Sequence, residues 1–216
     1  MKINLKKIDF VIFDCDGVIL DTNKIKTEAF QKTLKGFPEE KIAKLITFHK
    51  KNGGISRKIK FEYFFNNIIH DFDQKKINHS LKIFRKISFQ KILLSHYIKG
   101  VLKFIKILNR NNIKVFIVSG ALQSELRKMF ILRNKSKYFN KILGTPKNKI
   151  ENIKIILDKY SLDKNRGVFF GDSSTDYISA KKFKMNFIFV KDKSEWLNYK
   201  KIKKMKIINN FLDINV

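Results

Sequence analysis

Two aspartates one residue apart are the part of this sequence best suited to chemistry. Asp14 and Asp16 follow a short apolar run, FVIF (residues 10–13), and Gly17 comes next. An apolar run of this length that ends in a turn signal predicts a buried strand of a parallel sheet. Catalytic side chains of open α/β sheets lie just past the carboxyl ends of such strands. If the chain stays extended through Asp16, both carboxylates face one small site, where a divalent cation or a shared proton would relieve their repulsion.

Two later apolar runs also end in polar residues. Residues 113–118 (IKVFIV) lead to Ser119 and Gly120, and residues 168–170 lead to a loop that contains Asp172 and Asp176. Carboxyl ends of parallel strands share one edge of a sheet, so we expect these groups to converge with the two N-terminal aspartates.

A lysine lies between these two runs, at the start of a predicted helix. The segment TPKNKIENI offers Lys147 and Lys149. Asn148 and Glu151 match a capping box, which favours Lys149 in the first helical turn, facing the site. Lys147 is then a solvated loop charge.

The elements that must position these residues fall into two groups. Residues 22–96 show helical spacing without a strand: helices are predicted near 22–34, 38–49 and 56–70, with one or two more before 97, and Asp21 or Thr22 caps the first. Helices at 100–111, 122–132, 149–160 and 175–183 then alternate with strands at 113–118, 141–143, 168–170, 187–190 and an edge strand near 207–208. We predict an α/β fold, a Rossmann-like parallel sheet flanked by helices (residues 1–21 and 97–216), with an all-helical cap (22–96) inserted after the first strand.

Composition limits the partners. The formal net charge is +28, but only six of the 47 basic residues are arginine, and the lysines are scattered along every segment. We interpret them as solvated surface charge and expect no nucleic-acid partner. No apolar run approaches the ~18 residues of a membrane span, and the N-terminus lacks a secretory signal, so we expect a cytoplasmic protein. The single cysteine, Cys15, is interpreted as a small packing residue behind the carboxylate loop.

The order of these motifs resembles the haloacid dehalogenase superfamily. Its motifs are Asp-x-Asp-Gly after an apolar strand, a Ser or Thr that ends a second strand, a Lys at a helix start, and Gly-Asp-x-x-x-Asp. The sequence matches them with Asp14 to Gly17, with Ser119 in VSG, with Lys149, and with the stretch from Gly171 to Asp176. The helical block lies where phosphoglycolate-phosphatase-like members carry a C1-type cap.

The resemblance implies a Mg²⁺-dependent phosphatase that acts through an aspartyl-phosphate. Asp14 would attack the phosphorus, and Asp16 would protonate the leaving oxygen and then deprotonate the attacking water. Mg²⁺ would be held by the Asp14 carboxylate, the Asp16 backbone carbonyl and Asp172.

The remaining roles also come from the resemblance. Ser119 and the Gly120 N–H would hold phosphate oxygens beside Lys149, and Asp176 would orient that lysine or a metal-bound water. A further hypothesis comes from the residues themselves: the glycine turn at 53–54 leads into a helix start, where Arg57 or Lys60 would contact a second anion at the far end of the substrate. The alternative is an ordinary turn between helices with surface charges.

The resemblance implies a small phosphorylated metabolite as substrate, such as a sugar phosphate or a precursor of cell-surface polysaccharide. Two alternatives stay open: a phosphomutase of the β-phosphoglucomutase type, which uses the same acid pair, and a basic binding protein without turnover. The sequence does not decide between a monomer and a dimer.

Overall fold

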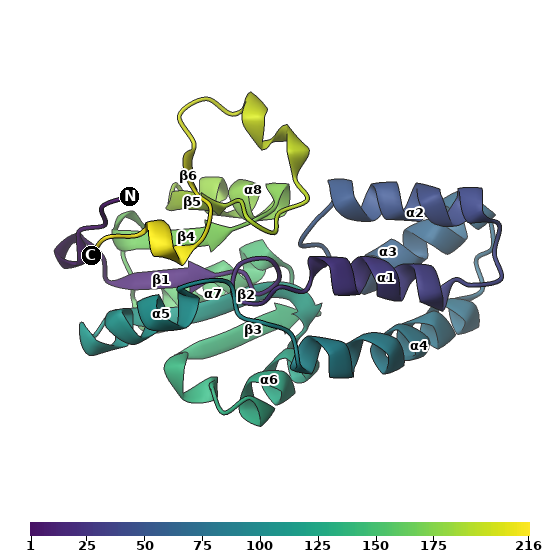
Figure 1. Cartoon of the computed structure of the whole chain (residues 1–216), viewed down its shortest axis with the longest axis horizontal. Helices are drawn as coiled ribbons and strands as arrows, with labels where there is room; N and C mark the ends of the chain where they lie inside the picture. The colour runs from purple at the N-terminus through teal and green to yellow at the C-terminus, as the bar shows by residue number, and fades with distance from the viewer.

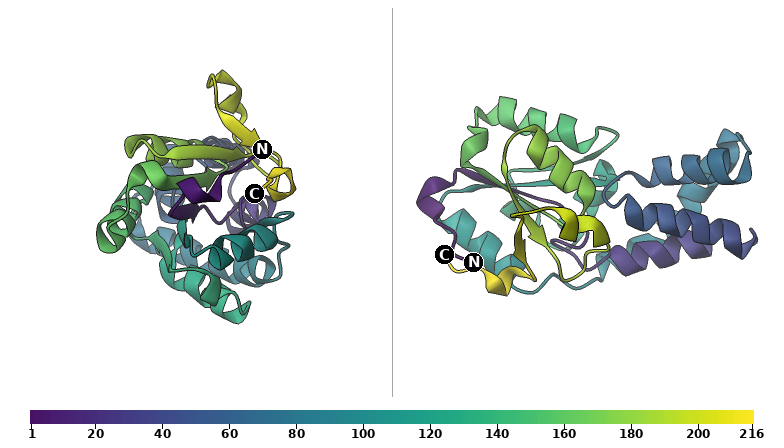
Figure 2. Two further views of the ribbon diagram at one scale, coloured as in Figure 1. Left: turned by 90° about the vertical axis from the view of Figure 1, so that its left-hand side faces the viewer. Right: turned by 90° about the horizontal axis from the view of Figure 1, so that it is seen from above.

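A parallel sheet with helices on both faces forms one part of the protein, and a group of helices extends from one end of it (Figures 1 and 2). The computed structural model describes all 216 residues. No helix combines the length and apolar character needed to cross a membrane.

The sheet has six strands in the order β3-β2-β1-β4-β5-β6, and all neighbours are parallel. The strands are β1 (Phe10–Phe13), β2 (Lys114–Leu122), β3 (Lys141–Thr145), β4 (Gly167–Gly171), β5 (Asn186–Val190) and β6 (Lys206–Ile208). Phe13 of β1 pairs with Ile117 of β2 on one side and Phe170 of β4 on the other. The predicted Rossmann-like sheet is confirmed, and the ends of β1, β2 and β4 lie side by side.

The two-residue period of β1 explains how the sheet is covered. Val11 and Phe13 belong to a core shared with α5 (Val101–Arg110) and α6 (Gln123–Leu132), and the intervening Phe10 and Ile12 pack with α7 (Lys149–Tyr160) and α8 (Ser174–Lys182). All four residues of β1 are fully buried because helices cover both faces of the sheet, and this explains why the strand contains only apolar residues.

The helical extension consists of α1 (Asn23–Thr33), α2 (Glu39–Lys51), α3 (Arg57–Tyr63), a π-helical turn (Phe64–Ile69) and α4 (Gln74–Leu93). It has its own core, which is rich in phenylalanine and includes Phe30, Phe61 and Phe84. The third helix was predicted as one α-helix over 56–70 but changes to a π-helix. The wider π turn lets the adjacent residues Phe64 and Phe65 both pack inward.

The chain passes between the sheet and the helical extension twice, before α1 and after α4, and backbone hydrogen bonds join these two segments. The Asp21 N–H donates to the His96 carbonyl at 2.9 Å, and the Ile98 N–H donates to the Ile19 carbonyl at 2.9 Å. Arg133, just after α6, donates to three carbonyls at the end of α4, those of Ile92, Leu93 and Ser95. The last carbonyls of α4, which have no partner within the helix, are thereby satisfied from the sheet side.

Strand β2 is longer than the sequence predicts. The run was expected to end at Val118, but the strand continues through Ser119 and Gly120 to Leu122. The pairing with β3 shifts between Val118 and Leu122, where Leu122 meets Thr145. This irregularity turns the backbone at Ser119 and Gly120 without ending the strand. Short 3₁₀ turns complete the chain at Leu5–Lys7, Ser136–Tyr138, Lys164–Arg166, Leu197–Lys201 and Phe211–Asp213.

Candidate active site

Asp14 lies at the carboxyl end of β1, between β2 and β4. Its N–H donates to the Phe170 carbonyl at 2.9 Å, which fixes the backbone, and its side chain is only 2% exposed. One carboxylate oxygen accepts from the Cys15 N–H at 2.7 Å, and the other lies 3.1 Å from the Lys149 ammonium. Burial, with the nearby Asp176 carboxylate, raises the pKa of Asp14 to about 7. A buried carboxylate that faces an ammonium is suited to attack an anionic group, because the ammonium offsets the repulsion.

Lys149 is the first residue of α7, and the predicted capping box is present. Asn148 accepts from the Glu151 N–H at 3.0 Å, and Glu151 accepts from the Asn148 N–H at 2.7 Å. Lys149 is buried and forms a second ion pair with Asp176, whereas Lys147 is exposed on the loop. Burial would lower the pKa of Lys149, but the two carboxylates raise it above its usual value. Lys149 therefore stays charged beside Asp14.

Asp176 holds that lysine in place. One of its oxygens pairs with Lys149, and the other accepts from the Ser173 hydroxyl at 2.5 Å and the Ser173 N–H at 3.1 Å. Both oxygens are occupied, and the side chain has no exposed surface. The arrangement fits a residue that positions Lys149 and leaves little capacity for binding a metal.

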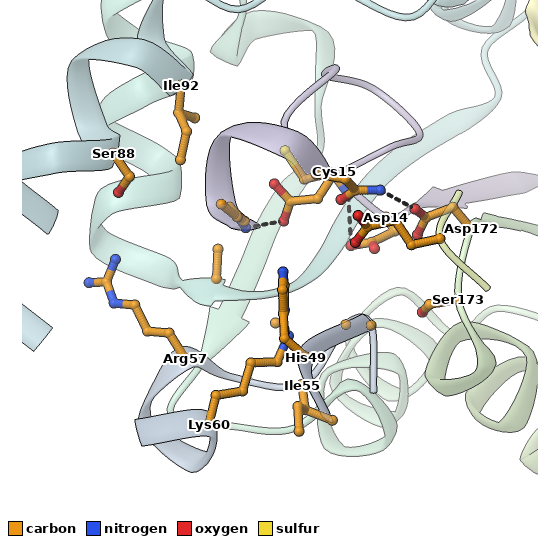
Figure 3. A pocket seen from close by; sticks show the side chains of 18 of the residues that line it. Asp14, Cys15, His49, Ile55, Arg57, Lys60, Ser88, Ile92, Asp172 and Ser173 are labelled. Atoms are coloured by element: carbon orange, nitrogen blue, oxygen red, sulfur yellow. Dashed lines mark hydrogen bonds and ion pairs between the residues drawn. The ribbon is translucent and has the colours of Figure 1, made fainter. Parts of the chain in front are cut away.

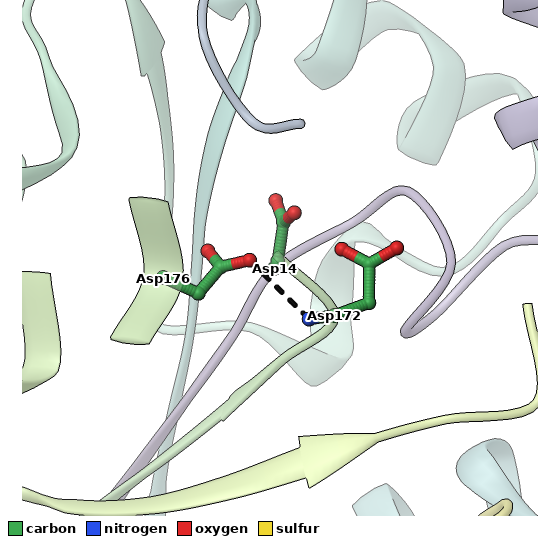
Figure 4. Close-up of side chains that lie close together, drawn as sticks. All are labelled: Asp14, Asp172 and Asp176. Carbon is green, nitrogen blue, oxygen red and sulfur yellow. Dashed lines mark hydrogen bonds between the residues drawn. The ribbon is translucent and has the colours of Figure 1, made fainter. Parts of the chain in front are cut away.

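Asp172 is the buried carboxylate without a cationic partner. One oxygen accepts from the Asn23 side chain at 2.7 Å, and no ammonium or guanidinium contacts it. Burial, with the charges of Asp14 and Asp176, raises the pKa of Asp172 well above its usual range. Oxygen atoms of the three aspartates lie within 4.8 Å of one another, and Figure 4 shows Asp14 and Asp172 pointing the same way. Two adjacent buried carboxylates, of which Asp172 has one oxygen without a hydrogen-bond partner, fit the ligand preference of Mg²⁺.

Asp16 lines the same pocket as Asp14 and Asp172 but is not part of the group of three aspartates. The chain leaves the strand after Phe13, so the expected extended run through Asp16 does not form. Its carboxylate pairs with Lys26 of α1 and accepts from the Thr22 hydroxyl at 2.6 Å. Burial acts to raise the pKa of Asp16, but the Lys26 ammonium and the Thr22 hydroxyl lower it below its usual value. Thr22 is the residue before α1, as predicted, but its hydroxyl donates to Asp16 and makes no capping bond to the helix.

The helical extension contacts the phosphate-binding candidates directly. Ser119 is fully buried, and its hydroxyl oxygen accepts from the Ala121 N–H at 3.1 Å. The adjoining Gly120 packs so tightly against the α2–α3 loop that a β-carbon on it would lie 2.1 Å from the Gly54 carbonyl oxygen. In the same loop, the Gly53 carbonyl accepts from the Thr175 hydroxyl at 2.7 Å. The loop thus closes over the ends of β2 and β4.

A pocket extends from the aspartates into the helical extension (Figure 3). Besides the aspartates, its lining includes the apolar side chains of Phe84 and Ile92 of α4 and of Met129 of α6. Arg57 lines this pocket, but its guanidinium makes two bonds to Glu125 of α6, at 2.8 and 2.6 Å. The structure therefore places Arg57 as a bridge between α3 and α6 whose charge is already paired.

The matching family model covers residues 11–190 and describes haloacid dehalogenase-like hydrolases. The chain belongs to this hydrolase family. None of the curated proteins matches the sequence of this hydrolase.

Solved structures resemble the hydrolase over nearly its whole length. CbbY from Rhodobacter sphaeroides, in complex with xylulose-(1,5)bisphosphate, is 14% identical and superposes with a TM-score of 0.77, over 95% of this chain and 96% of that one. A predicted phosphoglycolate phosphatase from Haemophilus somnus is 14% identical, with a TM-score of 0.74 over 96% of each chain. A predicted phosphatase from Clostridium acetobutylicum is 18% identical, with a TM-score of 0.73 over 97% of this chain and 94% of that one. At these identities the likeness establishes the shared fold.

Three residues of the hydrolase's site were not identified from the sequence: Asn23, Lys26 and His49. Asn23 and Lys26 are one turn apart on α1, so their shared face was a usable signal once Thr22 was placed before the helix. His49 had no such signal. Its contact with Lys60, a residue that the sequence analysis had named, forms only through the packing of α2 on α3.

Cys15 is buried in the core beside the sheet. It is 1% exposed, and burial together with Asp16 and Asp14 raises the pKa of its thiol well above the usual value. Its interpretation as a packing residue is confirmed.

Proposed function

We propose that this hydrolase is a phosphatase that removes a phosphoryl group from small phosphorylated metabolites through an aspartyl-phosphate on Asp14. The observation that carries the proposal is the buried contact between Asp14 and Lys149 at the end of β1. The names of the solved relatives, which include phosphatases, agree with this reaction class. Residues 22–96 would form the cap that encloses the substrate.

In the first step, a carboxylate oxygen of Asp14 attacks phosphorus, and the bond from phosphorus to the substrate oxygen breaks. Lys149, already held by Asp176, offsets the charge of the phosphoryl oxygens. The Ser119 hydroxyl and the Gly120 N–H would bind those oxygens as well. Water then attacks the aspartyl-phosphate and releases inorganic phosphate, which regenerates the carboxylate.

The leaving oxygen needs a proton, and the Asp16–Lys26 pair would supply it. Lys26 and Thr22 favour the ionised form of Asp16 in the free protein, so the ammonium of Lys26 carries the proton of the pair. We propose that the proton passes to the leaving oxygen through Asp16. The Asp16 carboxylate then accepts a proton from the attacking water.

The carboxylates of Asp14 and Asp172, with the Asp16 backbone carbonyl, would hold Mg²⁺. The bound ion supplies positive charge that neutralises the phosphoryl oxygens. Asp172 fits this role because it is buried with no cation of its own.

The first test is hydrolysis of p-nitrophenyl phosphate with and without Mg²⁺, beside Asp14→Asn. We expect Mg²⁺-dependent release of phosphate that falls more than about ten-thousandfold in the variant, because the nucleophile is lost. A panel of small phosphate esters, followed by ³¹P NMR, separates hydrolysis from the phosphomutase alternative, which would yield an isomeric ester. Equal activity of Asp14→Asn and the wild type would refute the mechanism.

A further inference from the structure

Lys60 is a buried cation in the cap that has no anionic partner. It belongs to α3, is 4% exposed and lines the pocket that leads to Asp14. No carboxylate lies within 4.0 Å of its ammonium. Its polar contact is Nδ1 of His49, at 2.7 Å. The two other lysines deep in the site, Lys26 and Lys149, each pair with an aspartate.

His49 does not balance this charge. Burial, together with the adjacent Lys60, lowers the pKa of His49 to about 2, so its ring is neutral. Nδ1 accepts from Lys60, and Nε2 therefore carries the proton and donates to the Thr27 hydroxyl at 3.2 Å. His49 orients the ammonium and adds no charge, so any positive charge of the pair lies on Lys60. An isolated buried charge is costly, so a lysine at the pocket wall without a carboxylate partner indicates a ligand that neutralises it.

The surroundings strengthen this argument. The Phe30 ring lies on the His49 ring, with centroids 4.8 Å apart, and its centroid lies 5.8 Å from the Lys60 ammonium. Such apolar walls reduce screening and make a charged contact stronger than it would be in water. Arg57, the other basic residue of α3 in the pocket, is already neutralised by Glu125.

We propose that the Lys60–His49 pair is a subsite for a second oxyanion, so the substrates are small phosphomonoesters that also carry a carboxylate or a second phosphoryl group. Asp14 would take the phosphoryl group that is removed, and Lys60 would bind the anion at the other end of the molecule. The inference rests on the proposed phosphatase function and adds the substrate class. It assigns the second-anion contact to Lys60 and leaves Arg57 to bridge cap and core.

The test compares esters in matched pairs that differ only in the second anion. Phosphoglycolate is set against hydroxyethyl phosphate for the carboxylate, and propanediol bisphosphate against hydroxypropyl phosphate for the phosphoryl group and a longer spacer. We expect kcat/KM of the wild type to favour the doubly anionic member of at least one pair by about tenfold to a hundredfold. In Lys60→Met that ratio should collapse toward one, whereas Lys58→Met, which alters an exposed lysine of the same helix, should keep it. The pair that shows the preference identifies the anion.

Binding to Asp14→Asn gives a second readout that needs no turnover. Calorimetry should show tighter binding of the doubly anionic ester, and adding Lys60→Met should remove the difference. If Asp14-dependent hydrolysis occurs but neither pair shows a preference, or Lys60→Met retains it, the subsite is wrong and the phosphatase function stands. If no ester is hydrolysed but the binding preference depends on Lys60, the subsite stands and the phosphatase function falls. Thermal melting checks the fold of each variant.

Discussion

Lys149 contacts two carboxylates at once: its ammonium lies 3.1 Å from Asp14 and forms an ion pair with Asp176. In the proposed mechanism the first contact faces the reaction, and the second fixes the lysine. The three groups come from the end of β1, from α7 and from α8, so the pairing also ties together the elements at this edge of the sheet. The proposed catalysis and the stability of the fold would therefore depend on the same residue.

Lys149→Met should reduce both properties. Removing the ammonium leaves Asp14 and Asp176 buried without a counterion, which should cost about 3–5 kcal/mol of unfolding free energy. Phosphate release should fall by about a hundredfold to a thousandfold. Chemical denaturation and steady-state kinetics measure the two effects. Lys147→Met is the matched control, because it removes an exposed lysine two residues away, and a comparable loss there would contradict the assignment.

Binding of Mg²⁺ should stabilise the protein through Asp172. The ion would neutralise a buried carboxylate that has no cation, so the melting temperature should rise with Mg²⁺ concentration as for any ligand of the native state. A chelator should abolish both the rise and the activity. Asp172→Asn should lose the Mg²⁺ response, whereas Asp158→Asn, at an exposed position of α7, should keep it. A full Mg²⁺ response in Asp172→Asn would place the ion elsewhere.

The sequence predicted the sheet and its catalytic edge because these depend on local signals. The apolar runs at β1, β2 and β4 each end in a polar residue, and the capping box at Asn148 and Glu151 singled out Lys149. Parallel pairing then brings the ends of those strands together without further information.

What the sequence could not predict are contacts between separate elements. Asp16 was expected to face the same site as Asp14, and both line one pocket, but the pairing of Asp16 with a lysine ten residues away in α1 could not be predicted. Arg57 was expected to bind substrate, and its pairing with Glu125 depends on how the cap sits on α6. The contact between Lys60 and His49 likewise requires the packing of α2 on α3.

Lys26→Met should slow substrates according to their leaving group. If the Asp16–Lys26 pair supplies the proton, alkyl phosphates need it, and their kcat should fall by about a hundredfold. The p-nitrophenolate ion leaves without a proton, so kcat for p-nitrophenyl phosphate should change much less. Steady-state kinetics with both esters give the ratio, and Lys24→Met on the same helix serves as the control. An equal fall for both esters would assign Lys26 to binding and not to proton transfer.

Arg57 and Glu125 should act as one unit that holds the cap to the core. In that case Arg57→Ala, Glu125→Gln and the double variant should raise KM by similar factors, with a coupling of about 1 kcal/mol or more. If Arg57 instead binds substrate, Arg57→Ala alone should weaken binding far more than Glu125→Gln. Arg85 also forms an ion pair with Glu125, at 3.3 Å, which Glu125→Gln removes as well. Arg85→Ala is therefore the control that measures the effect of losing this second pair alone.

The buried charge of Lys60 should make stability depend on pH. Burial, with the nearby Lys26 ammonium, lowers the pKa of Lys60 from 10.5 to about 7. Between these two values the unfolded chain binds more protons at this residue than the native protein does. The contribution of Lys60 to unfolding free energy should therefore become more favourable as pH rises from about 7 toward 10.

Lys60→Met isolates that effect, because the variant keeps the neutral His49 and the charges that act on this position, which are Lys26, Asp16, Glu195 and Lys149. At pH 7 the variant should be more stable than the wild type, since it removes a cation that is unpaired in the absence of ligand. The advantage should shrink as the pH approaches 10, where the wild-type lysine is neutral in the native protein. Denaturation of both proteins across this range gives the difference directly. A difference that does not change with pH would show that Lys60 keeps an ordinary pKa and that its charge is solvated or paired, and the case for an anion at this position would lose its physical basis.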